Sequence, residues 1–243
     1  MTRAARLREL HAGRGPGNAL VLPGPWDPGS ALIFADAGFS ALATPSHGVS
    51  AWLGYADGEC PAVEMFAAVT RIVRAADARE VPVTADIERG YGLPPVEIAE
   101  RLLATGAVGC NLEDTADGAL VEPARQADFL AEVRAALGPE PFLNARVDTY
   151  LRGAADPLAE ALARGRAYVE AGADGIYPFG APVADLPVLA RELGVPVNAI
   201  ALPDGPAPAA LSAAGATRIT YGGGLAAQAQ SALRALAQEI PKR

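Results

Sequence analysis

Three carboxylates that could bind a metal ion follow two apolar runs in the middle of the chain. Asp86 ends the run 81–86, Glu88 comes two residues later, and Glu113 follows the next run, 108–112. If the first run is a strand that continues, the spacing of two directs Asp86 and Glu88 to the same side. Mg²⁺ prefers oxygen ligands, keeps several waters and takes one or two carboxylates directly. We therefore expect Mg²⁺, with Mn²⁺ as the alternative ion, to bind Asp86 directly and Glu88 and Glu113 through water; capping of the following helices is the other role open to these side chains.

A buried arginine is the second candidate for chemistry. Arg146 ends the apolar run 142–146. Burying a guanidinium costs free energy unless it meets a carboxylate or a phosphate. We therefore expect Arg146 either to hold a substrate carboxylate or to pair with Glu113 or Asp148 inside the protein.

The loop expected after the second strand carries Ser46, His47 and Gly48. A single loop histidine is commonly solvated, and the spacing fixes no acid–base partner for His47. Ser46 lacks the Gly-x-Ser-x-Gly turn of serine hydrolases, so the sequence does not favour that class. The glycines 222–224 either cradle an anion or form a tight turn.

Composition excludes several classes of protein. Lys242 is the only lysine among the 20 basic residues, whereas Schiff-base aldolases, pyridoxal enzymes and P-loop nucleotide hydrolases each need an active-site lysine. The formal net charge of −8 disfavours nucleic acids and anionic membranes as partners. Two cysteines and two histidines are too scattered for a structural zinc site or a disulfide scaffold, which fits a cytoplasmic protein. The arginine-rich start has no apolar core, so we expect an amphipathic helix there and not a signal peptide.

Eight short β-rich runs alternate with eight longer helical stretches along the chain. Several helical stretches begin with proline and end near glycine, as helices commonly do. The predicted strands are 19–22, 41–44, 81–86, 108–112, 142–146, 175–177, 197–200 and 218–220. The predicted helices are 28–37, 61–76, 95–105, 123–137, 156–171, 183–193, 207–213 and 226–239.

Eight strand–helix units are the number that closes a barrel, and no Gly-rich dinucleotide turn follows the first strand. We therefore predict a single α/β domain over residues 1–243, a (β/α)8 TIM barrel rather than an open doubly wound sheet. Catalysis in such a barrel takes place at the carboxyl ends of the strands, where the polar residues described above fall.

The order of these residues resembles the isocitrate lyase/phosphoenolpyruvate mutase superfamily. The resemblance extends from about residue 20 to about residue 235. Its ordered segments are WDPGSA (26–31), AGF (37–39), SHG (46–48), LGYADGE (53–59), DIERGYG (86–92), NLED (111–114), NARVD (144–148) and AGAD (171–174).

The resemblance implies an α/β barrel whose last helix is exchanged between the subunits of a homodimer or homotetramer. It also implies Mg²⁺ and small, anionic, 2-oxo-acid-like substrates. By this resemblance Asp86 is the metal ligand, Glu88 and Glu113 are the outer carboxylates, and Arg146 holds the substrate carboxylate.

The resemblance further implies where the rest of the substrate lies. The backbone N–H groups of Ser46, His47 and Gly48 cradle its carboxylate and oxo oxygen, and Asp57 lies near it. We include Trp26, which follows the first strand, among the substrate-binding residues.

The chain departs from the best-known branches of the superfamily after Glu113. The lyases carry a Lys-Lys/Arg-Cys-Gly-His loop whose cysteine supplies a proton, and the phosphonate enzymes place lysine and asparagine in the same loop. Residues 115–122 here read TADGALVE and contain no cysteine, lysine, histidine or asparagine. The chain therefore resembles a short-loop branch.

These features favour a carbon–carbon lyase or decarboxylase that acts through an enolate on a small 2-oxo or 2-hydroxy (di)carboxylic acid. An oxaloacetate-like substrate demands the least of the shortened loop, because carbon dioxide leaves without an external base. Asp57 would move a proton, with His47 helping. The alternatives are an enzyme acting on a C–P bond and a 2-oxo-acid-binding protein without activity.

Overall fold

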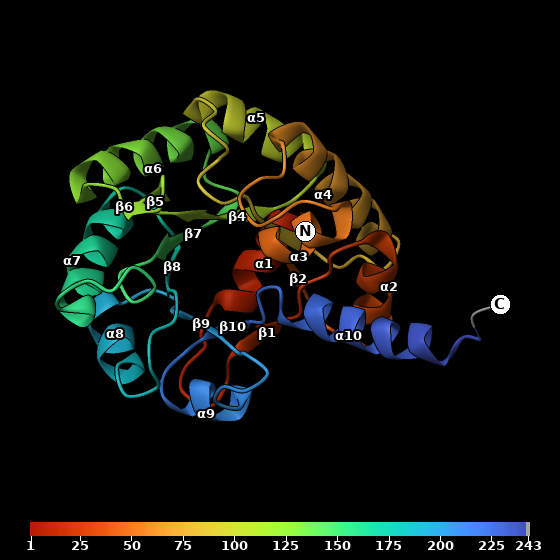
Figure 1. Cartoon of the computed structure of the whole chain (residues 1–243). Coiled ribbons are helices and arrows are strands. Elements are labelled where there is room, and N and C mark those ends of the chain that lie inside the picture. Colours follow the sequence, from red (N-terminus) through yellow and green to blue (C-terminus); the bar gives the residue numbers. More distant parts are fainter. Residues whose placement is uncertain (242–243) are drawn as a thin grey trace.

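Eight parallel strands close into a barrel in the computed structural model, which describes residues 1–241 (Figure 1). Hydrogen-bonded ladders join them in the orders β1–β10–β9 and β2–β3–β4–β7–β8. A bridge between Ile176 and Val197 connects β8 to the start of β9, and the N–H of Ala43 donates to the carbonyl of Pro23 at 3.1 Å beside β1. The strands are β1 (Leu20–Leu22), β2 (Leu42–Thr44), β3 (Val83–Asp86), β4 (Gly109–Glu113), β7 (Phe142–Val147), β8 (Gly175–Pro178), β9 (Asn198–Ile200) and β10 (Arg218–Thr220). The eight predicted strands and the barrel are confirmed.

Helices form a ring around the outside of the barrel (Figure 1). They are α2 (Pro28–Asp36), α4 (Ala62–Asp77), α5 (Pro95–Thr105), α6 (Pro123–Leu137), α7 (Pro157–Glu170), α8 (Leu186–Leu193), α9 (Pro208–Ala213) and α10 (Gly224–Glu239). Each of the eight predicted helical stretches overlaps one of them, although α4 ends one residue later and α10 begins two residues earlier than predicted. Local sequence starts α2 clearly, because Asp27 accepts a hydrogen bond from the N–H of Ser30 at 2.6 Å while the Ser30 hydroxyl accepts one from the N–H of Asp27 at 3.1 Å.

Two features of the fold were not predicted. Helix α3 (Ser46–Leu53) takes the place of the loop expected at residues 46–48, so that expectation is wrong. The helix begins after Pro45 without a side-chain cap and contains Gly48, so the usual signals of a helix start are missing. A Cβ on Gly48 would lie 2.9 Å from Pro45 Cγ and 3.2 Å from Ala226 Cβ, and this close approach explains the glycine. The second feature is an antiparallel hairpin formed by β5 (Thr115–Ala116) and β6 (Ala119–Leu120).

The amino end of the barrel is closed by α1 (Arg3–His11), which confirms the helix expected at the start of the chain. Leu7 and Leu10 are buried against Leu20, Leu22 and Phe142. The barrel interior just above this layer is polar. Buried Arg218, Asn198, Asn144 and Asn111 are joined there by side-chain hydrogen bonds.

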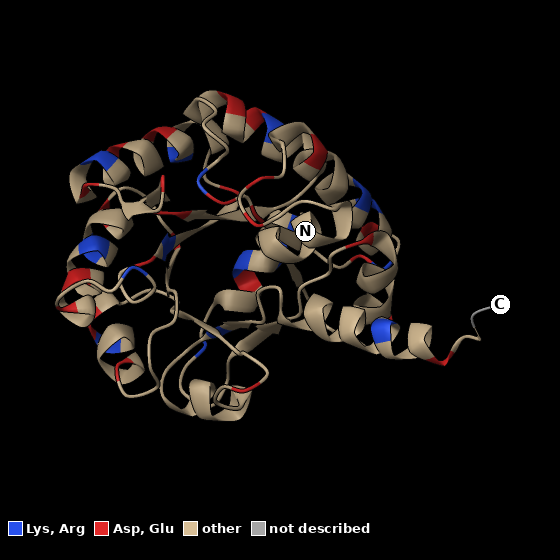
Figure 2. Ribbon diagram, in the orientation of Figure 1, with Lys and Arg blue, Asp and Glu red and all other residues tan. Residues whose placement is uncertain are grey.

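Helix α10 leaves the ring and projects away from the barrel (Figure 1), and its residues are largely exposed. The acidic and basic residues lie mostly on the outer helices and the loops (Figure 2). No helix in residues 1–241 is long and apolar enough to span a membrane. Lys242 lies outside the described residues, so the extension of the single domain to residue 243 stays a prediction.

Candidate active site

A cavity of about 660 Å³ lies at the carboxyl ends of the strands. The loops after β2, β3, β4 and β7 all contribute to its wall. Ser46, Asp57, Glu88, Glu113 and Arg146 line it, so the fold brings these five predicted site residues to one place.

The turn after β3 places Asp86 and Glu88 close together. The strand ends at Asp86 and does not continue to Glu88, which adopts a left-handed backbone conformation with φ of 53°. In this turn the N–H of Glu88 donates to Asp86 Oδ1 at 3.1 Å. The carbonyl of Glu88 accepts from the N–H of Glu113 at 3.0 Å, which ties the third carboxylate to the other two. A tight turn, and not the alternation of a continuing strand, therefore assembles the acidic group.

Burial raises the pKa of all three carboxylates. It raises the pKa of Glu88 to about 7, with Asp86 and then Asp57 adding to the effect. It raises the pKa of Glu113 to about 8, against the opposing charge of Arg146 and with the support of Asp86, Asp148 and Glu88. The pKa of Asp86 is also raised by burial. Negative charge is therefore crowded at this end of the barrel, and a cation would stabilise it.

The acidic group fits a hydrated magnesium ion. The Oε1 atom of Glu88 is buried without a hydrogen-bond partner among the described residues, and all the nearby donor atoms are hard oxygens. No three acidic, histidine or cysteine side chains within residues 1–241 converge closely enough to hold an ion by themselves. One direct carboxylate with water-mediated outer carboxylates is the arrangement that both observations allow. Asp86 is not among the residues that line the cavity, so its role as the direct ligand stays a prediction from the family resemblance.

Arg146 is held between two carboxylates. Its Nη1 lies 2.8 Å from Glu113 Oε2, while its Nε and Nη2 donate to the two oxygens of Asp148 at 2.7 and 3.1 Å. Its guanidinium carbon lies 4.2 Å from the ring centre of Phe179. The internal pairing that the sequence left open is present. Because a guanidinium has five N–H groups and these contacts use three, one N–H on each Nη remains for a ligand.

Asp148 holds the Arg146 guanidinium in place. Its side chain is fully buried, and its N–H donates to Asp114 Oδ1 at 2.9 Å. The Thr115 hydroxyl donates to Asp148 Oδ2 at 2.8 Å and accepts from Arg152 Nε at 3.3 Å. Thr115 and Arg152 both line the cavity, although sequence reasoning did not single them out. The sequence signal that could have led to these two residues was the Arg146–Asp148 pair, because it marks the β7–α7 loop as part of the site.

The first turn of helix α3 lies beside the cavity, where the sequence predicts the substrate to bind. Ser46, His47 and Gly48 are its first three residues, and the first helical hydrogen bond found here is donated by Val49 to the Pro45 carbonyl at 3.0 Å. The N–H groups of the first turn therefore have no acceptor within the helix, and they carry the positive end of the helix dipole. Ser46 is buried and lines the cavity, whereas the side chain of His47 is exposed.

Trp26 and Asp57 occupy different surroundings. Asp57 is exposed on the loop after α3, close enough to Glu88 for its charge to raise the pKa of that carboxyl. Trp26 is half-buried, with its ring centre 6.3 Å from that of Phe34 and 6.1 Å from that of Trp52. It is not among the residues that line the cavity, so a substrate contact for Trp26 stays a prediction.

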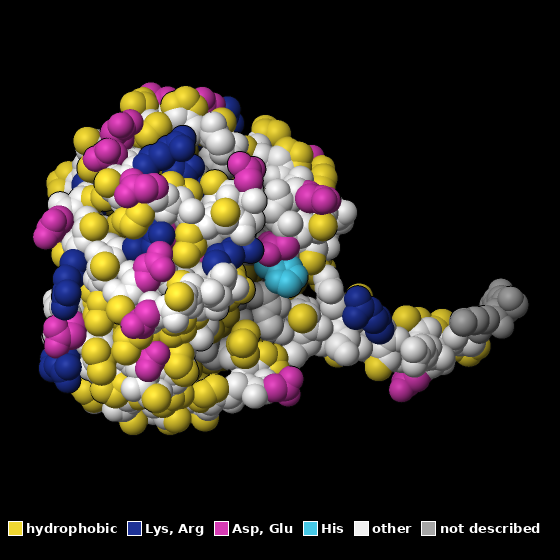
Figure 3. Space-filling view, turned by 60° about the vertical axis from the view of Figure 1, so that its left-hand side comes forward, with side chains coloured by type: hydrophobic (Ala, Val, Ile, Leu, Met, Phe, Trp, Pro, Cys, Tyr) yellow, Lys and Arg dark blue, Asp and Glu magenta, His cyan; other side chains and the backbone are white. Residues whose placement is uncertain are grey.

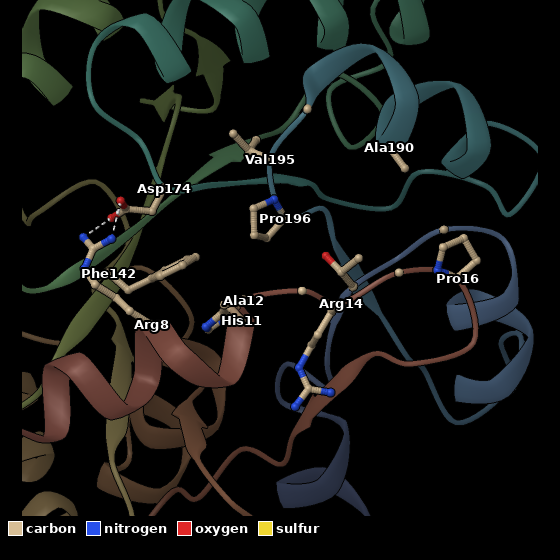
Figure 4. Close-up of a pocket in the computed structure, with 15 residues that line it drawn as sticks. Arg8, His11, Ala12, Arg14, Pro16, Phe142, Asp174, Ala190, Val195 and Pro196 are labelled. Atoms are coloured by element: carbon tan, nitrogen blue, oxygen red, sulfur yellow. Dashed lines mark hydrogen bonds and ion pairs between the residues drawn. The ribbon is translucent and has the colours of Figure 1, made fainter. Parts of the chain in front are cut away.

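A second cavity, of about 520 Å³, lies at the opposite, amino end of the barrel (Figure 4). Arg8 faces Asp174 across it, with two hydrogen bonds of 2.8 and 2.9 Å. The Nδ1–H of His11 donates to the Leu7 carbonyl at 2.8 Å. Because these charged and polar groups satisfy one another and face away from the strand ends, we place the chemistry in the cavity at the carboxyl end.

Comparison with known proteins agrees with this geometry. The family model for phosphoenolpyruvate phosphomutase matches residues 7–241. The uncharacterized protein Rv1998c of Mycobacterium tuberculosis is 36% identical over 223 residues, which cover 89% of this chain and 84% of that protein. The 2,3-dimethylmalate lyase of Eubacterium barkeri is 32% identical over 191 residues, which cover 73% of this chain and 63% of the lyase. A solved structure from Burkholderia cenocepacia J2315 is 39% identical, with a TM-score of 0.88 over 97% of this chain and 99% of that one.

Proposed function

The chain belongs to the phosphoenolpyruvate phosphomutase family, within the isocitrate lyase/phosphoenolpyruvate mutase superfamily, and from that premise we propose that it is a Mg²⁺-dependent carbon–carbon lyase. Relatives in this superfamily cleave C–C or C–P bonds. The proposed reaction is decarboxylation of a small 2-oxo dicarboxylate that resembles oxaloacetate. One observation carries the proposal: Glu88 and Glu113, both with raised pKa values, and the largely buried Arg146 face the same cavity at the carboxyl end of the barrel.

In the proposed reaction the protein holds the part of the substrate that does not leave. The two unused N–H groups of Arg146 bind the carboxylate next to the oxo group. The N–H groups at the start of α3 meet the oxo oxygen, where negative charge develops as the C–C bond breaks. Mg²⁺, when bound at Asp86, adds positive charge close to that oxygen. The electrons of the broken bond form the enolate, and carbon dioxide leaves.

The enolate must then take up a proton at the carbon that lost the carboxylate. Asp57 lies at the rim of the cavity and can deliver this proton directly or through water. His47, exposed on the first turn of α3, is the second group able to exchange protons with solvent there. No lysine or cysteine is needed for this step, which suits the sequence TADGALVE at residues 115–122.

One relative supports C–C chemistry on a dicarboxylate, whereas the matching family model is named for a C–P mutase. The E. barkeri relative is a lyase of 2,3-dimethylmalate, which is itself a dicarboxylate. Phosphonate groups carry more charge than carboxylates and call for additional cationic contacts. The only lysine of this chain is Lys242, so that extra charge has to come from elsewhere.

Turnover of oxaloacetate and phosphonopyruvate, each measured with Mg²⁺ and corrected for spontaneous decay, separates the candidate reactions. We expect the first to be consumed and the second to be left unchanged. Consumption of phosphonopyruvate alone would replace the proposal by C–P chemistry. Binding of both acids without turnover of either would make the chain a binding protein.

The metal assignment is tested by Asp86→Asn, with Asp128→Asn on the exposed face of α6 as the control. We expect Asp86→Asn to lower Mg²⁺ affinity and turnover by more than about a hundredfold without a change in melting temperature, because a neutral amide is a weaker ligand for a hard cation. Asp128→Asn should change neither quantity. Unchanged Mg²⁺ binding, followed by calorimetry, in Asp86→Asn would contradict the assignment.

The proposal includes assembly into a homodimer or homotetramer through α10. Leu233, Leu236 and Ile240 are 57%, 59% and 66% exposed on and just after this projecting helix. The helix stands clear of the body in the space-filling view (Figure 3). Large apolar side chains exposed in this way are typical of a surface covered by a partner. A second copy of the chain is the partner that the family resemblance favours.

A further inference from the structure

Three arginines line the cavity at the carboxyl end, and they differ in what holds them. Arg146 is engaged by two carboxylates. Arg89 is directed toward α6, where its Nε donates to Gln126 Oε1 at 3.1 Å and its guanidinium carbon lies 4.6 Å from the ring centre of Phe129. Arg152 likewise donates only through Nε, and its two terminal nitrogens have no partner among residues 1–241. Unlike Arg89, it is exposed and its guanidinium lies on no aromatic ring of the described residues. Arg152 is therefore the cavity arginine left most available to a ligand.

Arg152 is nevertheless held in place. Its backbone N–H donates to the Asp148 carbonyl at 2.8 Å, which closes a turn directly after β7. Its Nε donates to the Thr115 hydroxyl, whose own proton goes to Asp148. Since Asp148 also pairs with Arg146, two side chains connect the guanidiniums of Arg146 and Arg152. A chain of hydrogen bonds thus connects the two cations, an arrangement that suits a ligand with two anionic groups.

The charge of the cavity requires such a second cation. Its lining includes four acidic residues, Asp57, Glu88, Glu113 and Asp117. A substrate with a second carboxylate would be repelled by them unless a cation lay at its far end. Arg146 is largely neutralised by its own partners, and the hairpin at Thr115–Leu120 contains no basic residue.

We propose that Arg152 binds the far carboxylate of a dicarboxylate substrate whose first carboxylate is held at Arg146, and so selects dicarboxylates over monocarboxylates. This inference rests on the proposed function and deepens it, since it names the group that recognises the second carboxylate. Arg152 belongs to the β7–α7 loop and contacts Thr115, the first residue of the β5–β6 hairpin. Because the far carboxylate is the group that leaves as carbon dioxide, Arg152 acts in selecting and binding the substrate, and its contact is given up as the C–C bond breaks.

Calorimetric titration of the full chain with saturating Mg²⁺ tests the inference. The probes are oxalate, which mimics the head of the substrate, and 3,3-difluorooxaloacetate, which adds the far carboxylate and whose integrity is followed by fluorine NMR during the titration. Arg152→Gln should weaken difluorooxaloacetate binding about ten- to a hundredfold, the effect expected of a lost charge-assisted hydrogen bond, and leave oxalate within about twofold. Arg152→Lys should recover part of the loss. Arg125→Gln, which removes an equal charge from the exposed face of nearby α6, should change neither affinity.

The outcomes separate this inference from the proposed function. If Arg152→Gln weakens both probes equally, Arg152 acts on the whole site and the selectivity assignment is wrong. If the variant changes neither probe, the far carboxylate is recognised elsewhere, while the proposed function is decided separately by the turnover of oxaloacetate. If the wild type binds neither probe with Mg²⁺, the proposed function fails and the inference fails with it.

Discussion

His11 should make the stability of this protein fall in mild acid, although it lies far from the active site. The ring is buried beneath the barrel and stacks on Phe142 with 4.0 Å between ring centres. With Nδ1–H donating to the Leu7 carbonyl, Nε2 is left as an acceptor 3.4 Å from Arg218 Nη1. Burial is the main cause that lowers the His11 pKa to about 3, and the charges of Arg218, Arg14 and Arg8 lower it further against the opposing bond to Leu7.

The size of the effect follows from the two pKa values. In the unfolded chain His11 titrates near its ordinary value of about 6.5, so below that pH the unfolded state binds a proton that the folded state does not. Stability is therefore full above about pH 6.5 and is lost as the pH falls toward about 3. At about pH 5 the difference is about 1.5 units, and at about 1.36 kcal/mol per unit the loss is about 2 kcal/mol.

Urea unfolding at about pH 8 and about pH 5 measures this loss, with His11→Gln as the test variant. Glutamine can still donate and accept hydrogen bonds but does not titrate. We expect the wild type to lose about 2 kcal/mol more than His11→Gln between the two pH values, because all other titrating groups are common to both. His47→Gln, which changes the exposed histidine, should behave like the wild type. Equal losses in wild type and His11→Gln would refute the reasoning.

Two further predictions concern the fold and the assembly. A Cβ on Gly109 would lie 2.6 Å from the Phe142 carbonyl oxygen in the β4–β7 ladder, so Gly109→Ala should lower the free energy of unfolding by about 3 kcal/mol or more. Gly29→Ala, where the nearest atom would be 3.4 Å away, should cost less than about 1 kcal/mol, and a similar loss in both variants in urea melts would contradict the packing argument. Leu236→Glu on α10 should shift the protein to the monomer in light scattering with the melting temperature of the barrel retained, because a charge cannot be buried in an apolar interface without cost. An unchanged mass would show that α10 is not the interface.

The strands could be predicted because local sequence carries their signal. Most of them are short apolar runs bounded by turn residues and followed by a helix that begins at or beside a proline, so their type and position did not depend on distant contacts. Helix α3 lacked those signals. It is formed where Gly48 allows the start of α10 to pack closely against it, and a contact across nearly the whole chain cannot be read from local pattern.

The candidate site divides in a similar way. Asp86, Glu88, Glu113 and Arg146 could be selected from the sequence because charged residues at the ends of buried strands are costly without a purpose. How these four side chains are arranged relative to one another could not be predicted from the sequence. The sequence left open whether Arg146 would pair internally, and only the structure shows that it pairs with both Glu113 and Asp148.

The sequence alone determined the barrel, the acidic group and the exclusion of lysine chemistry, because periodicity, residue type and composition are local properties. Tertiary structure decided which cations face the cavity and which of them remain available to a ligand. Arg89 and Arg152 are the same residue type and cannot be told apart in the sequence. In the structure Arg89 stacks on Phe129, whereas Arg152 is linked through Thr115 to Asp148. That difference arises from hydrogen bonds between loops that follow different strands, and those loops meet only when the barrel closes.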